Sequence, residues 1–196
     1  MNIPNILTMS RIVLALVLVF LLKQGSEAGN IMAVVVFIIA SLTDYFDGHL
    51  AKSQGLVSDF GKIMDPIADK VLLLLTLGVL AHLGMIDWRM FAVIAAREIL
   101  VTASRLCAML CHGRVLGAEG AGKIKTVIQM MAVLVILLYL VARGSDFCAG
   151  WFSHVQKNWE SLINMLMWAA VILTVYSGGE YFRNKWKMGH ETRGAH

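Results

Sequence analysis

Six stretches of this 196-residue chain are apolar over about the length that a helix needs to cross a lipid bilayer. A transmembrane helix requires roughly 20 predominantly apolar residues, because the hydrocarbon core is about 30 Å thick. Hydrophobic residues make up 58% of the chain and charged residues only 15%, a balance typical of multi-spanning membrane proteins. The predicted spans cover residues 8–22, 31–51, 62–82, 88–110, 123–142 and 162–178. We therefore expect an all-α integral membrane protein with one membrane domain over residues 1–196.

The N-terminal segment and the basic residues predict how this domain is oriented. Pro4 favours the first turn of a helix, so a short interfacial helix is expected before the first span. One side of the predicted topology carries most of the basic residues: Arg11, Lys52, Lys62, Arg114, Lys123, Lys125, Arg183, Lys185, Lys187 and Arg193. Positive charge marks the cytoplasmic side, so both termini are expected to be cytoplasmic. The net charge of +4 fits that membrane face, and without a soluble basic domain it does not indicate a nucleic-acid partner.

Four aspartates interrupt the apolar sequence at the cytoplasmic ends of the second and third predicted spans. They are Asp44, Asp47, Asp65 and Asp69. A charged side chain at membrane depth costs about 2.5–3.5 kcal/mol on the milder scales unless it is neutralised. Residues three and four apart share a helix face, so each pair forms an acidic stripe. Carboxylate oxygens are the ligands that Mg²⁺ and Mn²⁺ prefer, and paired ions commonly support phosphoryl transfer. The pattern predicts a site for divalent metal.

Small residues accompany these acids. Gly48 and Ala51 share the face of the first pair, and Gly61 precedes the second pair by one helical turn. Because they carry little or no side chain, a neighbouring helix or a flat substrate group can approach closely there. An isolated intramembrane acid would also fit a proton relay or a lone ion pair. Asp59 and Asp87 are interpreted as ordinary helix-end or surface residues.

A divalent-cation transporter is the alternative from a different functional class. Intramembrane acids also build ion pathways, so the four aspartates by themselves permit it. Transport needs acids that are accessible from both sides of the membrane. The predicted acids instead gather at one face, together with basic residues, which favours an enzyme.

The spacing of the acids resembles the signature of the CDP-alcohol phosphatidyltransferase family. The pattern runs Asp44-x2-Asp47-Gly48-x2-Ala51-Lys52-x8-Gly61-x3-Asp65-x3-Asp69. The resemblance implies a six-helix membrane enzyme in which an alcohol displaces CMP from a CDP-linked donor. It implies that the four aspartates hold two Mg²⁺ or Mn²⁺ ions, that Asp65 and Asp69 are catalytic, and that Asp69 takes the proton of the acceptor hydroxyl. Lys52 departs from the family pattern, which has arginine there: the charge is kept, but the planar fork suited to bidentate contacts is lost.

Three further segments resemble one bacterial branch of this family. They are the opening Asn2-Ile-Pro4-Asn5-Ile-Leu-Thr8-x2-Arg11, the run Ala96-Arg97-Glu98 with Arg105, and Gly122-Lys123-Ile-Lys125-Thr126-x2-Gln129. This resemblance implies CDP-diacylglycerol as donor, sn-glycerol 3-phosphate as acceptor, and a homodimer in the bacterial inner membrane with a cytoplasmic active site. The residues expected to bind the CDP donor are Asn5, Asp47, Gly48, Ala51, Lys52 and Gly61.

Four basic residues are expected to bind the acceptor phosphate: Arg97, Arg105, Lys123 and Lys125. They lie at about the depth of the acids, and arginine and lysine are suited to a phosphate dianion. Each has a simpler interpretation: a positive flank for Lys123 and Lys125, a local pair with Glu98 for Arg97, and a pair with some other acid for Arg105. Inositol phosphate, phosphatidylglycerol and serine remain alternative acceptors, although a neutral amino acid would not call for a basic pocket.

Overall fold

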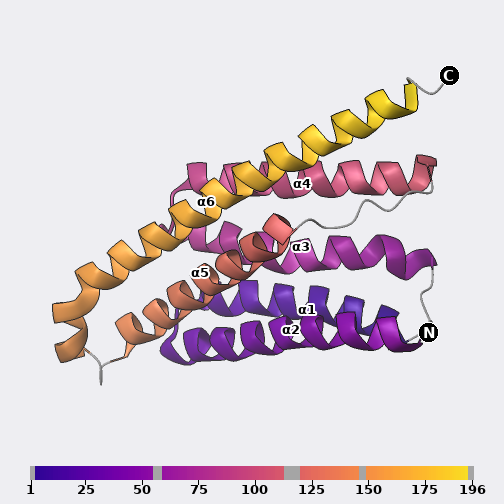
Figure 1. Cartoon of the computed structure of the whole chain (residues 1–196). Coiled ribbons are helices and arrows are strands. Elements are labelled where there is room, and N and C mark those ends of the chain that lie inside the picture. Colours follow the sequence, from indigo (N-terminus) through magenta and orange to yellow (C-terminus); the bar gives the residue numbers. More distant parts are fainter. Residues whose placement is uncertain (1–2, 55–58, 113–119, 146–148, 194–196) are drawn as a thin grey trace.

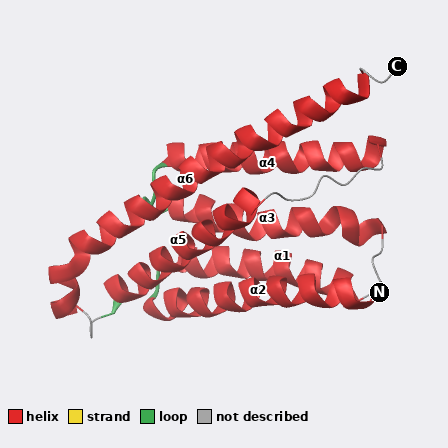
Figure 2. Cartoon of the chain, viewed as in Figure 1, coloured by secondary structure: helices red, strands yellow, loops and turns green. Residues whose placement is uncertain are grey.

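The computed structural model describes residues 3–54, 59–112, 120–145 and 149–193, which contain six α-helices and no β-strand (Figure 2). Side chains are described over residues 9–43, 67–68, 70–108, 124–145 and 154–184. The helices are α1 (Ile3–Gln24), α2 (Glu27–Gln54), α3 (Asp59–His82), α4 (Trp88–His112), α5 (Gly120–Gly144) and α6 (Ala149–Arg193). The all-helical prediction is confirmed for this part of the chain.

The helices form one bundle in which distant parts of the sequence are neighbours. Helix α1 packs against α2 and α3, α5 packs against α6 and α2, and α4 packs against α3 and α6. Figure 1 shows that α1 starts, α2 ends, α3 starts and both α4 and α6 end toward the same end of the bundle. A continuous apolar core joins the helices, with Leu18, Leu77, Ile94, Ile136 and Met167 among its buried members.

Two tight connections at the other end of the bundle depend on glycine. Gly25 between α1 and α2 has a φ of 64°, and Gly84 between α3 and α4 has a φ of 72°. This left-handed conformation crowds the Cβ of other residues, whereas glycine adopts it readily. The connections are short, so the helices that they join run antiparallel.

The N-terminal segment differs from the prediction of a separate interfacial helix. Helix α1 runs from Ile3 to Gln24 without a break. Pro4 stands in its first turn, where the missing backbone N–H removes no hydrogen bond, and no further proline or glycine occurs before the helix ends. The expected interfacial helix and first span are therefore parts of one helix.

The last helix is much longer than the predicted span over residues 162–178. Helix α6 contains 45 residues, from Ala149 to Arg193. Its extra turns are polar, and hydropathy alone assigns such sequence to loops. The polar extensions continue the helix at both ends of its apolar middle.

Two described segments are long and apolar enough to cross a membrane: Ile124–Gly144 and His154–Asn184. Large apolar side chains are also exposed on the outside of the bundle; Phe20, Met165 and Ile172 are 68%, 62% and 63% exposed. Soluble monomers rarely expose extensive apolar surface, because its contact with water is unfavourable. The outer surface is suited to lipid.

Candidate functional site

The predicted acidic stripes lie on two helices that share neighbours. Asp44 and Asp47 are in α2, and Asp65 and Asp69 are in α3. Helix α1 packs against both helices, and α5 also contacts both. Several predicted positions lie outside the residues whose side chains are described: Asn5, Asp44, Asp47, Gly48, Ala51, Lys52, Gly61, Asp65, Asp69 and Lys123. Their grouping into a metal and donor site stays a prediction.

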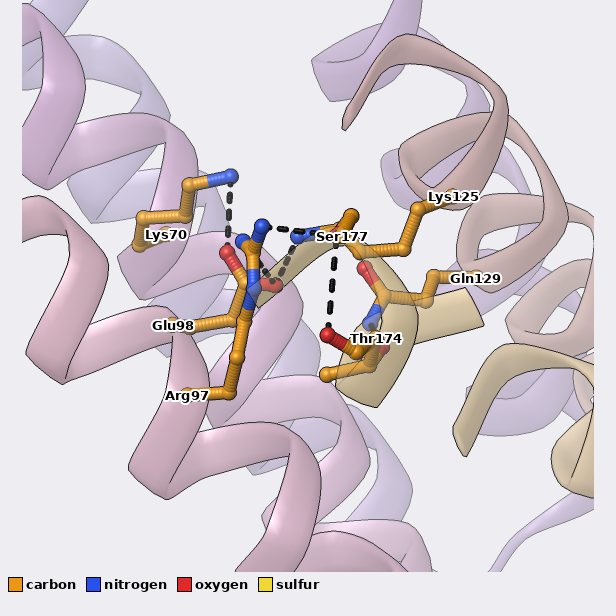
Figure 3. Close-up of polar contacts among 7 residues, drawn as sticks. All are labelled: Lys70, Arg97, Glu98, Lys125, Gln129, Thr174 and Ser177. Carbon is orange, nitrogen blue, oxygen red and sulfur yellow. Dashed lines mark hydrogen bonds and ion pairs between the residues drawn. The ribbon is translucent and has the colours of Figure 1, made fainter. Parts of the chain in front are cut away.

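A buried carboxylate, Glu98 on α4, organises the described part of the site. Its side chain is fully buried, and its Oε2 lies 3.1 Å from Lys70 Nζ on α3. Its Oε1 lies 3.4 Å from Arg97 Nη1 and accepts a hydrogen bond from Lys125 Nζ on α5. Figure 3 shows Lys70, Arg97 and Glu98 approaching from one side of this cluster, with Lys125 on the other. One carboxylate thus ties together cations from three helices.

Two of the predicted phosphate-binding residues, Arg97 and Lys125, therefore meet at one point. The local pair between Arg97 and Glu98, the simpler interpretation of Arg97, is present as well. Lys125 is 1% exposed, which does not fit an ordinary solvated charge at the edge of a span. Among the side chains that the structure describes, three cations surround this one carboxylate. Such a group of cations is suited to binding an anion.

Helix α6 supplies the polar wall of this cluster. Arg97 Nη2 donates a hydrogen bond of 2.7 Å to Ser177 Oγ, and Gln129 Nε2 on α5 donates one of 3.1 Å to Thr174 Oγ1 (Figure 3). Gly178, which follows Ser177, lets α6 approach the arginine closely: a Cβ there would lie 3.2 Å from Arg97 Cγ. These contacts hold the guanidinium between α4 and α6.

Arg105 lies further along α4 and contacts α6 in a different way. Its guanidinium carbon is 5.4 Å from the centre of the Tyr181 ring, within the range of a cation–π interaction. The Tyr181 hydroxyl donates a hydrogen bond of 3.4 Å to Ser104 Oγ. The simpler interpretation paired Arg105 with a neighbouring acid; among the described side chains, the contact seen is with the Tyr181 ring.

Sequence reasoning gave no role to Lys70, Thr174 and Ser177, and it named Glu98 only as a local partner of Arg97. Glu98 carried a usable signal, because an acid in the middle of an apolar helix is costly without a partner. Lys70 directly follows Asp69 in α3, which placed it near the predicted acids. Thr174 and Ser177 are three residues apart and so share a face of α6. Nothing local in the sequence indicated which helix that face contacts.

A second polar feature lies at the other end of the bundle. A pocket of about 490 Å³ is bounded by the α3–α4 connection, the end of α5 and the early turns of α6. Glu160 on α6 accepts hydrogen bonds from Tyr139 Oη at 3.2 Å and from Gln156 Nε2 at 2.9 Å. None of the predicted site residues lines this pocket. It is separate from the cationic cluster.

A family model and several similar proteins agree on the family of this chain. The model of the CDP-alcohol phosphatidyltransferase family matches residues 1–176. A protein of Bacillus subtilis named CDP-diacylglycerol–glycerol-3-phosphate 3-phosphatidyltransferase is 35% identical, over 95% of this chain and 96% of its own. A Rickettsia typhi protein of the same name is 31% identical over 93% and 96% of the two chains. A Mycobacterium tuberculosis protein named probable phosphatidylglycerophosphate synthase is 36% identical over 92% and 79%. The chain belongs to the CDP-alcohol phosphatidyltransferase family.

Proposed function

We propose that this protein transfers the phosphatidyl group of CDP-diacylglycerol to sn-glycerol 3-phosphate, yielding phosphatidylglycerophosphate and CMP. Relatives that match nearly the whole chain carry the name of this activity. The structural observation that carries the proposal is the cluster of Lys70, Arg97 and Lys125 around the buried carboxylate of Glu98. Family membership favours this enzyme over the cation transporter.

The acceptor is the part of the proposal that the cluster supports best. The described side chains around Glu98 are mostly cationic, and the phosphate of glycerol 3-phosphate is an anion. Arginine and lysine form strong charge-assisted hydrogen bonds with phosphate oxygens. Serine has no phosphate to occupy such a site. Arg105 and Lys123 are proposed to complete it.

The acidic half of the site is proposed to lie on α2 and α3. Four carboxylates are a donor set suited to two Mg²⁺ or Mn²⁺ ions, held by Asp44, Asp47, Asp65 and Asp69. Such ions, when bound, neutralise the diphosphate and stabilise the departing CMP. The proposed cytidine site comprises Asn5, Asp47, Gly48, Ala51, Lys52 and Gly61. The acyl chains of the donor are proposed to stay in the surrounding lipid.

The proposed chemistry is one displacement at phosphorus. Asp69 takes the proton from the free primary hydroxyl of glycerol 3-phosphate. The hydroxyl oxygen forms a bond to the β-phosphorus of the donor, and the bond from this phosphorus to CMP breaks. Arg97 and Lys125 hold the acceptor phosphate, so the hydroxyl is oriented before the reaction. The acceptor hydroxyl is thereby held in a fixed position relative to the phosphorus that it attacks.

The proposed topology has six transmembrane helices, both termini in the cytoplasm and the site facing the cytoplasm of a bacterial inner membrane. The two segments apolar enough to cross a membrane and the exposed apolar surface support the membrane location. A green fluorescent protein fused to the C-terminus is expected to fluoresce, and alkaline phosphatase fused there is expected to be inactive. Active phosphatase would contradict the orientation. A homodimer is also proposed, and mass measurement in detergent tests it.

The function is tested with purified protein, CDP-diacylglycerol and Mg²⁺. Release of CMP is followed with glycerol 3-phosphate, inositol phosphate, phosphatidylglycerol or serine as the acceptor. We expect CMP release with glycerol 3-phosphate to exceed release with each other acceptor, and to cease when EDTA removes the metal. Faster release with another acceptor would overturn the assignment of the acceptor. Metal uptake into proteoliposomes without CMP release would favour the transporter.

A further inference from the structure

Glu98 is the member of the cluster to which the proposed mechanism assigns no role. It lies on α4 and bridges Lys70 on α3 with Lys125 on α5. Its two oxygens are divided between these contacts: Oε2 faces Lys70 and Oε1 faces Lys125. Glu98 therefore connects the helix that carries the predicted catalytic acids with a predicted phosphate ligand.

On α3, the residue that contacts Glu98 is Lys70. Lys70 directly follows Asp69, the proposed base, in the sequence. A fixed contact between Lys70 and Glu98 sets the position of this turn of α3 relative to α4. The contact of Glu98 with Lys125 sets α5 relative to the same carboxylate. The three helices that the hydroxyl and phosphate of the acceptor would touch, α3, α4 and α5, thus meet at this carboxylate.

We propose that Glu98 is a positioning residue that holds the phosphate-binding cations in register with the turn of α3 that carries Asp69. This inference rests on the proposed function, because the register matters only if the acceptor carries both a phosphate and a reacting hydroxyl. Glu98 itself does not touch the substrate. Its negative charge gathers cations that would otherwise repel one another, and its two oxygens fix their spacing.

A positioning role predicts an unusual kinetic signature for Glu98→Gln. The substitution removes a negative charge, so the cluster becomes more positive and its attraction for phosphate does not fall. The KM for glycerol 3-phosphate should therefore rise less than threefold. The cations lose their common partner, so the bound hydroxyl is displaced from Asp69, and kcat should fall at least tenfold because misplacement by about 1 Å is enough to slow a reaction strongly.

Substitution of a phosphate ligand should give the opposite signature. Lys125→Met removes positive charge from the site, so we expect the KM for glycerol 3-phosphate to rise at least tenfold. The contrast between the two variants separates orientation of the acceptor from attraction of the acceptor. The KM for CDP-diacylglycerol should stay within twofold of wild type in both.

The experiment measures both kinetic constants for glycerol 3-phosphate, with kcat expressed per CDP-binding site so that unfolded protein does not contribute. Glu160→Gln is the matched control, because Glu160 is a hydrogen-bonded carboxylate at the other end of the bundle. We expect wild-type constants for this control. If Glu98→Gln has a kcat per CDP-binding site within twofold of wild type, the carboxylate is only structural and the proposal is wrong.

Lys70→Met tests the same register if Glu98→Gln yields no CDP-binding protein. The Lys70 side chain is 26% exposed, so the bundle tolerates its replacement better. We expect kcat per site to fall at least threefold, while the exposed Lys157→Met control is unchanged. An unchanged kcat in Lys70→Met would overturn the proposal. Failure of the proposed function looks different: the wild-type protein would release CMP faster with another acceptor than with glycerol 3-phosphate. In that case kcat of Glu98→Gln and of wild type is compared with that other acceptor.

Discussion

Arg97 on α4 donates a hydrogen bond of 2.7 Å to the hydroxyl of Ser177 on α6. The other terminal nitrogen of this guanidinium faces Glu98. Arg97 is thus held from two sides, by Glu98 on its own helix and by Ser177 on α6. The direction in which it presents its charge depends on both contacts.

Ser177→Ala should loosen this arginine without removing its charge. A hydrogen bond to a charged group contributes about 1.5–3 kcal/mol, of which only a part concerns phosphate binding. We expect the KM for glycerol 3-phosphate to rise about three- to tenfold, with kcat less affected, in a CMP-release assay. Ser161→Ala, an exposed position on the same helix, is the control. An unchanged KM in Ser177→Ala would show that Arg97 does not bind the acceptor.

Adjacent glycines on α6 offer a matched pair of substitutions. A Cβ at Gly178 would meet Arg97 Cγ at 3.2 Å, whereas a Cβ at Gly179 would meet nothing within 4 Å. Alanine is preferred over glycine in a helix by about 1 kcal/mol at either position. Gly178→Ala should displace Arg97 and raise the KM for glycerol 3-phosphate several-fold, and Gly179→Ala should match wild type. Equal kinetics in the two variants would contradict the role of the close approach.

The ring of Tyr181 is expected to keep Arg105 in place. Tyr181→Phe retains the ring and loses only the hydroxyl contact with Ser104. Tyr181→Leu removes the ring, and a cation–π interaction contributes about 0.5–2 kcal/mol, which corresponds to roughly 2- to 30-fold in binding. We expect a rise of this size in the KM for glycerol 3-phosphate with Leu and little change with Phe. If both variants behave alike, the ring does not orient Arg105.

The proposed roles of Asp65 and Asp69 predict loss of turnover without loss of the protein. Replacement of either by Asn keeps the size of the side chain and removes its charge. We expect CMP release to fall roughly 10²- to 10⁴-fold, the usual contribution of acid–base groups. Radiolabelled transfer in membranes measures it, with protein amount determined by immunoblot. Asp87→Asn is the control, since Asp87 accepts a hydrogen bond from the backbone N–H of Arg89 at the start of α4. Substantial activity in Asp65→Asn or Asp69→Asn would refute their assignment.

The helices, and the meeting of two of the four predicted basic residues, Arg97 and Lys125, were predictable from the sequence. Apolar runs of the right length located all six helices, because hydropathy directly reports which residues avoid water. The convergence of Arg97 and Lys125 followed from their common depth. Glu98 was visible as an intramembrane acid and as a local partner of Arg97, but its partners on other helices were not. Lys70 lies 28 residues before it and Lys125 lies 27 residues after it. Only tertiary packing brings such positions together.

The differences from prediction have specific physical causes. The N-terminal interfacial helix merges with the first span because the residues between Pro4 and Gln24 contain no helix breaker. The polar ends of α6 remain helical because hydrogen bonds along the backbone continue whether or not the side chains are apolar. Hydropathy measures where a helix prefers lipid, and it does not measure where the helix ends.

The length of α6 has a mechanical consequence. At about 1.5 Å per residue its 45 residues extend over roughly 67 Å, about twice the thickness of the hydrocarbon core of a bilayer. A straight rod of that length in a bilayer projects into water. Ser177 and Gly178 belong to the same continuous helix, so a movement of its protruding turns would shift the residues that contact the Arg97 side chain. Under the proposed role of Arg97, the affinity for glycerol 3-phosphate would then depend on how the ends of α6 outside the lipid are held.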